Sequence, residues 1–129
     1  MSQESRDIMT RIERFEDIRA WQKARELVKS IYQITGNEDL ARDHSLKDQI
    51  RRASISVMGN IAEGFSRQTD REFIQFLHVA KSSASEVQSQ LHVACDLKYI
   101  WQATFKELIE LSEETIRLVS GFVRYLKGG

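Results

Sequence analysis

Residues 69–97 read TDREFIQFLHVAKSSASEVQSQLHVACDL. The apolar residues of this stretch recur at steps of three or four, at Phe73, Phe76, Ala80, Ala84, Val87, Leu91 and Ala94. This spacing places them on one side of an α-helix. Thr69 and Glu72 form a capping box, which marks the start of a helix. A helix over residues 69–97 would be about 43 Å long at ~1.5 Å per residue, a length typical of helical bundles.

Three further segments, on both sides of this stretch, carry the same helical period. We expect helices over residues 17–35, 45–64 and 102–126. Asp17 is expected to cap the first of these helices and Ser45 the second, because short polar side chains bond the free N–H groups of a first turn.

The connections between these segments are short and polar, and the longest is the predicted loop at residues 36–44. Short connections make consecutive helices antiparallel. The sequence therefore predicts an all-α protein, an antiparallel up-and-down four-helix bundle over residues 15–127. A flexible N-terminal arm is expected at residues 1–14.

The composition fits one small helical domain of 129 residues, without proline and with six glycines to interrupt helices. The formal net charge is zero, so nucleic-acid binding would need a local basic patch. Cys95 is the single cysteine, which is typical of a reducing compartment. Since we find neither a secretion signal nor an apolar run long enough to span a membrane, we expect a soluble, cytoplasmic protein with no membrane partner.

A row of polar residues runs between two apolar stripes of the second predicted helix, and the third helix carries a matching row. The members are Gln49, Arg52, Ser56, Asn60 and Glu63, with Glu86 and Gln90 reaching across. We interpret the row as a buried polar network that fixes helix register, with Arg52 facing Glu63 or Glu86. The alternative is a ligand or catalytic site, which would need a carboxylate of shifted pKa in a cleft.

A second apolar stripe lies along the last predicted helix, and one bundle does not need all of it inside. Its members are Ile109, Ile116, Val119 and Val123, with Trp101 near the helix start. Exposed apolar surface of this kind is typical of an interface, and self-association is its simplest use. We therefore expect a homo-oligomer that forms through these residues.

The histidines do not fit a carboxylate-bridged metal site, which needs Glu-x-x-His pairs on two helices. Ala41, Gln75 and Ser89 stand three residues before the three histidines, so no such pair exists. Neither a glycine-rich phosphate loop nor a nucleophile motif is present. We expect no metal, no cofactor and no enzymatic activity.

Several blocks of the chain resemble one known family. Residues 15–24 read FEDIRAWQKA, residues 49–67 read QIRRASISVMGNIAEGFSR and residues 72–86 read EFIQFLHVAKSSASE. Residues 90–94 (QLHVA) and 97–100 (LKYI) continue the likeness. Together the blocks resemble the four-helix-bundle family encoded in 23S rRNA intervening sequences, across nearly the whole chain.

This resemblance implies an up-and-down four-helix bundle that forms ring-like homopentamers. It also implies a relationship to the accessory protein of diversity-generating retroelements, a pentameric barrel that contacts nucleic acid and a reverse transcriptase. The family has no established enzymatic activity. Three departures stand out. Relatives commonly have a proline in the first interhelix loop, whereas residues 36–44 have none. Lys81 and Lys98 occupy positions where relatives commonly have glycine, and we expect both sites to tolerate a helical residue.

Three functions are compatible with these observations. The first is an oligomeric protein that binds RNA or DNA, with contacts from Lys47, Arg51, Arg67 and Arg71. The segment from Lys47 to Arg71 holds five basic and three acidic residues. The second is a scaffold or adaptor that binds another protein without nucleic acid. The third, an enzyme that works through Arg52, Asn60, Glu63 and Glu86, has the least support.

Overall fold

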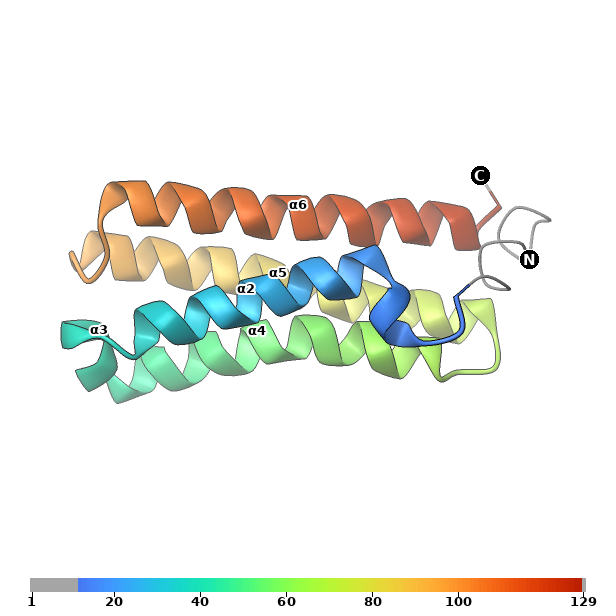
Figure 1. The fold of residues 1–129 in the computed structure, drawn as a ribbon, viewed down its shortest axis with the longest axis horizontal. Helices are drawn as coiled ribbons and strands as arrows, with labels where there is room; N and C mark the ends of the chain where they lie inside the picture. Colours follow the sequence, from blue (N-terminus) through green and yellow to red (C-terminus); the bar gives the residue numbers. More distant parts are fainter. Residues whose placement is uncertain (1–11, 129) are drawn as a thin grey trace.

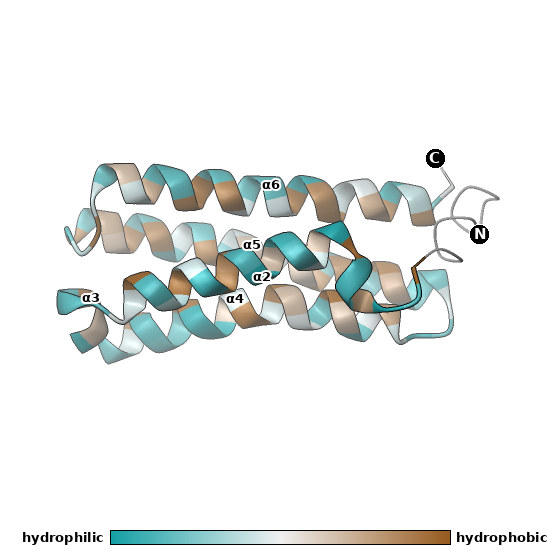
Figure 2. Cartoon of the chain, in the orientation of Figure 1, coloured by the Kyte–Doolittle hydropathy of each residue, from teal (hydrophilic) through white to brown (hydrophobic). Residues whose placement is uncertain are grey.

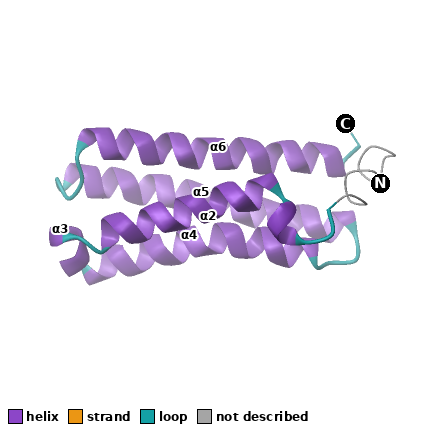
Figure 3. Cartoon of the chain, viewed as in Figure 1, coloured by secondary structure: helices purple, strands orange, loops and turns teal. Residues whose placement is uncertain are grey.

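The computed structural model describes residues 12–128, and every regular element in that range is a helix (Figure 3). The elements are η1 (Phe15–Asp17), α2 (Arg19–Thr35), α3 (Glu38–Arg42), α4 (His44–Phe65), α5 (Asp70–Asp96) and α6 (Gln102–Leu126). Most of the predicted N-terminal arm, residues 1–14, lies outside the described residues. None of the described helices is long and apolar enough to cross a membrane.

The four long helices lie side by side along the long axis, and consecutive long helices run in opposite directions (Figure 1). Helix α4 packs against α5, and α5 packs against α6. Helix α2 closes the bundle, because it packs against both α4 and α6. The predicted all-α fold of packed helices is therefore confirmed for the single chain.

The core runs the length of the bundle because apolar residues recur in successive turns of each long helix, between hydrophilic ones (Figure 2). One core cluster includes Trp21, Phe73 and Leu77, and a second includes Leu27 and Ile50. Each fully buried leucine or phenylalanine contributes about 1.5–3 kcal/mol relative to an exposed one. This burial makes the single chain a folded unit that can present its outer faces to partners.

Helix starts agree with the sequence at α5 and differ at α2 and α4. Thr69 Oγ1 accepts a hydrogen bond from Glu72 N at 3.2 Å, so the predicted cap by Thr69 is confirmed. The Glu72 carboxylate accepts from Thr69 Oγ1 at 3.1 Å rather than from the backbone N–H of Thr69, so the second bond of a capping box is replaced by a bond between the two side chains. The cap of α4 is Asp43, whose carboxylate accepts from Leu46 N at 3.1 Å. Asp17 does not cap α2, which begins one residue after Ile18 and has no side-chain cap.

The predicted loop at residues 36–44 contains the short helix α3. Leu40 within it is fully buried and packs beside Leu46 and Ala94, which anchors α3 to the end of the bundle. Five residues are too few to show a helical period, so sequence patterning could not reveal α3.

Lys98 adopts a left-handed backbone conformation, with φ of 63°, directly after α5. Its N–H donates to Cys95 O at 3.0 Å, and Tyr99 N donates to Ala94 O at 2.9 Å. These two bonds form the Schellman motif that usually ends a helix with glycine. The expectation that this site tolerates a helical residue is therefore wrong, because the backbone here is not helical.

Candidate functional site

The basic residues that we selected from the sequence lie near the two ends of α4. Lys47 and Arg51 lie in its first turns, whereas Arg67 and Arg71 lie around the α4–α5 connection. Arg51 and Arg67 are 16 positions apart, which corresponds to ~24 Å along a helix. The four residues therefore do not form one patch.

Arg67 is already engaged within the chain. Its Nη2 lies 2.7 Å from Glu63 Oε1, and its guanidinium lies over the ring of Phe76 at 4.6 Å from the centroid. The Glu63 carboxylate offsets the charge of Arg67, which makes Arg67 a poorer phosphate ligand than a free arginine. Arg71, in the first turn of α5, is exposed.

Arg51 is held at the junction of α4 and α2. Its Nε donates to Thr35 Oγ1 at 2.7 Å, and its guanidinium lies 4.2 Å from the centroid of the Tyr32 ring. Tyr32 itself is 39% exposed. Arg51 therefore joins an exposed aromatic ring of α2 to the basic start of α4.

Helix α2 adds positive charge that the sequence analysis did not select. Residues 19–35 contain four basic residues and one acidic residue, Glu26. Arg25, Lys29 and Tyr32 follow one another at steps of four and three, so they share a helix face. We call the surface formed by Arg25, Lys29, Tyr32, Lys47 and Arg51 the basic face.

Glu26, the single acidic residue of α2, forms an ion pair with Lys23 of the same helix. Lys23 Nζ lies 2.9 Å from a carboxylate oxygen of Glu26 and 3.6 Å from one of Glu114. The hydrogen bond to Glu26, aided by the charges of both carboxylates, raises the pKa of Lys23. Glu26 is thus paired with Lys23, whereas Arg25 and Lys29 are exposed, with the Arg25 guanidinium 5.7 Å from the centroid of the Trp21 ring.

Sequence reasoning missed Arg25, Lys29 and Tyr32 because it counted charge along a single segment, from Lys47 to Arg71. The excess of basic residues in α2 was a visible signal. Its link to Arg51 depends on the packing of α2 against α4, which spacing within one helix does not reveal.

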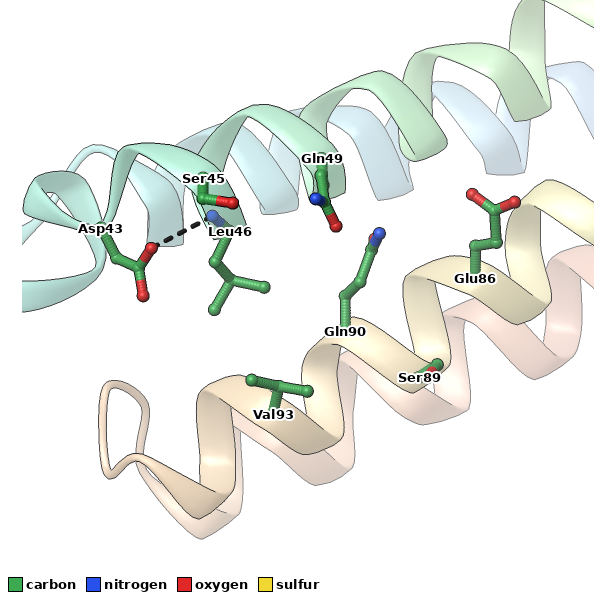
Figure 4. Close-up of a pocket in the computed structure, with 8 residues that line it drawn as sticks. All are labelled: Asp43, Ser45, Leu46, Gln49, Glu86, Ser89, Gln90 and Val93. Carbon is green, nitrogen blue, oxygen red and sulfur yellow. Dashed lines mark hydrogen bonds between the residues drawn. The ribbon is translucent and has the colours of Figure 1, made fainter.

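A polar groove runs between α4 and α5. Its walls are lined by Gln49, Arg52, Ser56, Ser83, Glu86 and Gln90. Gln49 from α4 and Gln90 from α5 point toward each other, and Glu86 reaches toward α4 (Figure 4). The side chains of Ser56 and Ser83 meet at 2.9 Å, so small hydroxyls bring the two helices close together.

The polar row is not the buried network that we expected. Gln49, Arg52, Glu63 and Glu86 are exposed, and Arg52 forms no ion pair with Glu63 or Glu86. Within the described chain, the hydrogen bonds of the row centre on Ser56 and the half-buried Asn60, whose Nδ2 donates to Ser56 O at 2.8 Å and Ser56 Oγ at 2.9 Å. The row lies on the groove rim because a helix in a four-helix bundle buries one side and leaves the other to solvent.

The remaining member of the row, Gln90, lines this groove, and its side-chain oxygen is buried. That oxygen has no hydrogen-bond partner among the described residues. No group of three or more His, Cys, Asp or Glu residues within residues 12–128 is arranged to hold a metal ion.

The apolar stripe predicted on the last helix is divided by the structure. Val119 and Val123 are 1% and 7% exposed and belong to the core, so they are not interface residues of the folded chain. Ile109 and Ile116 are half-buried, whereas Trp101 is 83% exposed.

The physical reason is that the side of α6 that faces the core includes Val119 and Val123 together with polar residues. Ser112 is fully buried. It accepts a hydrogen bond from Gln88 Nε2 at 2.8 Å and donates one to Ile109 O at 2.7 Å. These bonds satisfy the hydroxyl, so the serine can lie in the core.

The fold and its surfaces define a small helical protein that carries charged and polar outer faces. The chain belongs to the 23S rRNA-intervening sequence protein family, whose family model matches residues 16–121. The resemblance noted from the sequence blocks is thereby confirmed.

A solved structure has a similar fold. It is the crystal structure of a protein of unknown function from the S23 ribosomal protein family of Bacteroides thetaiotaomicron. The two chains superpose with a TM-score of 0.75 at 24% sequence identity, over 81% of this chain and 98% of that chain. This likeness supports the fold. No curated protein matches the chain.

Proposed function

We propose that the protein is a non-enzymatic, cytoplasmic homo-oligomer that binds nucleic acid through the basic face. The observation that carries this proposal is the Arg51 guanidinium over the exposed ring of Tyr32, 4.2 Å from its centroid. The other three basic residues follow on the same sides of the two helices, Lys47 one turn before Arg51 on α4 and Lys29 and Arg25 one and two turns before Tyr32 on α2. Lysine and arginine side chains neutralise phosphates, and an exposed aromatic ring offers a stacking surface to an unpaired base. Single-stranded nucleic acid fits this combination best.

The zero net charge of the chain is compatible with this function because its charges are unevenly distributed. Residues 102–115 of α6 hold four acidic residues and one basic residue, the reverse of the balance in α2. Local potential, rather than net charge, steers a charged ligand to a surface.

RNA is the nucleic acid that we propose first, because the description of the family refers to 23S rRNA. The ring-like homopentamer implied by the resemblance is part of the same proposal. A ring would repeat the basic face around its circumference, and several weak contacts to one strand then act together.

We propose that the protein is not an enzyme because the residues of the polar row do not converge on one site. The enzyme alternative requires Arg52, Asn60, Glu63 and Glu86 to converge on a substrate. Glu63 instead pairs with Arg67, and Asn60 bonds its own helix.

The test is binding of a short labelled single-stranded RNA, followed by fluorescence anisotropy at low salt. Reversal of two charges, Arg25→Glu with Lys29→Glu, should weaken binding at least about tenfold. The control is the same change of net charge on α6, Arg117→Glu with Arg124→Glu, both of which are exposed. The control should bind within about twofold of the natural protein. Equal loss in both variants, or no loss in either, would contradict the proposal.

A scaffold that binds another protein is the second candidate, and one observation favours it. Trp101 and Leu97 are both exposed at the α5–α6 connection. Beside them is a cleft lined in part by Glu38, Lys98 and Tyr99. Absence of RNA binding at low salt would leave this candidate as the better account of the surface.

A further inference from the structure

We infer that the cleft beside Trp101 is a binding site for a guanine base. The cleft lies where the α5–α6 connection meets the start of α3, at the end of the bundle where α2 ends and α4 begins (Figure 1). This inference rests on the proposed function, because it names the base that a bound strand places at this end of the molecule. It adds a second contact region to the basic face.

The first support is the size of the cleft and the exposed ring that lines it. The cleft has a volume of about 500 Å³, within the range of about 300–1,000 Å³ that is typical of small-ligand sites. Trp101 is 83% exposed and lines the cleft together with Tyr99 and Ile100. An indole ring left to water offers a large stacking surface, and proteins hold unpaired bases by stacking them on aromatic rings.

The second support is a pair of opposite charges in the same cleft. Glu38 at the start of α3 and Lys98 of the α5–α6 connection both line it, and neither forms an ion pair within residues 12–128. A carboxylate accepts hydrogen bonds and an ammonium group donates them. The cleft therefore presents an acceptor and a donor from two segments of the chain, which is what reading the edge of a base requires.

This combination of groups matches guanine better than the other bases. Guanine carries the acceptor O6 beside the donors N1–H and N2–H₂, so Lys98 can donate to O6 while Glu38 accepts from the two nitrogens. Adenine and cytosine have an amino group in place of O6 and a ring-nitrogen acceptor in place of N1–H, which opposes both contacts. Uracil lacks the second donor.

Gln102 adds a further donor to the cleft. Its Oε1 accepts a hydrogen bond from Cys95 Sγ at 3.4 Å. Because this bond uses the amide oxygen, the amide NH₂ group is the part of Gln102 that can donate to a ligand. A second donor in the cleft suits guanine O6, which has two lone pairs to offer.

The third support is backbone strain at the two charged residues. Glu38 and Lys98 have φ of 51° and 63°, a left-handed conformation that lowers stability in residues other than glycine. Strained residues of this kind cluster at ligand sites. Both line one cleft here, and each brings a charged group to it, so we attribute these two side chains to ligand binding.

The cleft lies at the same end of the bundle as part of the basic face. Tyr32 lies in the last turn of α2, and Lys47 and Arg51 lie in the first turns of α4. Ile34 and Asn37, just after Tyr32, line a smaller hollow whose walls include part of the cleft. A strand whose phosphates contact the basic face can therefore continue over the end of α2 into the cleft.

Binding of guanosine monophosphate (GMP), compared with adenosine monophosphate (AMP), tests this inference without RNA. Both carry the same phosphate, so the difference between them reports the base. The chain has two tryptophans and Trp21 is buried, so GMP should quench the emission of Trp101 and leave that of the Trp101→Phe variant unchanged. Equilibrium dialysis should give an affinity for GMP at least about fivefold higher than for AMP. No quenching in the natural protein, or equal affinity for the two nucleotides, would overturn the inference.

Removal of the exposed ring tests stacking. Trp101→Ala should weaken GMP binding at least about fivefold, while circular dichroism shows an intact bundle. The matched control is Tyr125→Ala, which removes another exposed ring near the end of α6 and should bind GMP within about twofold of the natural protein. Equal affinity of the two variants for GMP would contradict stacking on Trp101.

Lys98→Gly separates binding from stability. The variant should melt at a higher temperature, because glycine relieves the left-handed backbone, yet its preference for GMP over AMP should fall to within about twofold, because the donor to O6 is gone. Glu38→Gln should lower the preference as well, since an amide presents a donor where only acceptors suit guanine. A Lys98→Gly variant that gains stability and keeps the full preference would show that Lys98 does not read the base.

The nucleotide and RNA measurements distinguish failure of this inference from failure of the proposed function. If GMP binds selectively at Trp101 but the charge reversal at Arg25 and Lys29 leaves RNA affinity unchanged, the proposed function alone is overturned. If that reversal weakens RNA binding and GMP is not preferred, this inference alone is overturned, and the cleft is left to the protein partner of the second candidate function.

Discussion

Gly64 of α4 and Phe73 of α5 pack so closely that a Cβ at position 64 would lie 2.7 Å from Phe73 Cδ1 and 2.9 Å from Phe76 Cβ. This approach sets the spacing of the two helices that form the polar groove. Gly64→Ala should therefore lower the free energy of unfolding by about 1–3 kcal/mol, because a well-packed core does not accept an extra methyl group. Urea denaturation measures the change.

Gly121→Ala is the control for this prediction. The Cβ site of Gly121 meets the end of Arg124 at 3.8 Å, an ordinary contact. Alanine should stabilise α6 here by about 0.5–1 kcal/mol. Equal effects of the two substitutions would show that the Gly64 contact does not hold the helices together.

Lys98 has a left-handed backbone conformation at the end of α5, which lowers the stability of the fold for a residue other than glycine. Lys98→Gly should raise the free energy of unfolding by about 1 kcal/mol, since glycine adopts this conformation without a Cβ clash. Lys81, the other lysine at a position where relatives commonly have glycine, lies inside α5. Lys81→Gly should instead destabilise by about 1 kcal/mol. Stabilisation by both substitutions would refute this reading.

Tyr99 ties the α5–α6 connection to the start of α4, and its contribution depends on pH. Its hydroxyl donates to Asp43 Oδ2 at 3.1 Å, and this hydrogen bond, with burial and the nearby carboxylates, raises the pKa of Tyr99. A raised pKa means that the bond stabilises the fold below the ordinary tyrosine pKa of about 10 and is lost as pH rises through the folded value.

Tyr99→Phe should accordingly lower the thermal midpoint near neutral pH. The difference from the natural protein should shrink as the pH is raised above about 10. Melting curves by circular dichroism across this range provide the measurement. A gap that stays constant through the tyrosine titration would show that the hydroxyl does not stabilise the fold in this way.

Thr69 caps α5 through bonds to Glu72, whereas Ser45, the cap expected for α4, makes no cap bond. Thr69→Ala should therefore lower the free energy of unfolding by about 1 kcal/mol. Ser45→Ala should change it by less than about 0.5 kcal/mol, as surface substitutions usually do. Chemical denaturation of the two variants measures both changes. A larger loss of unfolding free energy in Ser45→Ala than in Thr69→Ala would contradict the assignment of the cap to Thr69.

The helices could be predicted because their signals are local. The period of three and four in α5 and its Thr69 cap depend on neighbouring residues alone, and α6 begins and ends where the pattern indicated. Helix α3 could not be predicted in this way, because its single buried side chain, Leu40, is fixed by tertiary contacts.

The outer surfaces were harder to predict, because they depend on which side of each helix the bundle buries. The sequence predicted Val119 at an interface, but the side of α6 that carries it faces the core. The sequence predicted Arg52 in a buried network, but the residue is exposed on the rim of the groove. The basic face joins Arg51 of α4 to Tyr32 of α2, a contact between distant positions that spacing along either helix does not encode.

The dependence of RNA affinity on salt tests the central claim most directly. Four cations that neutralise phosphates of a single strand predict a plot of log binding constant against log salt with a slope of about −3, since each contact contributes about −0.7. In the Arg25→Glu and Lys29→Glu variant the slope should fall toward half of that value. A natural protein whose RNA affinity does not change with salt, or whose slope is unchanged in the variant, would contradict binding through the basic face.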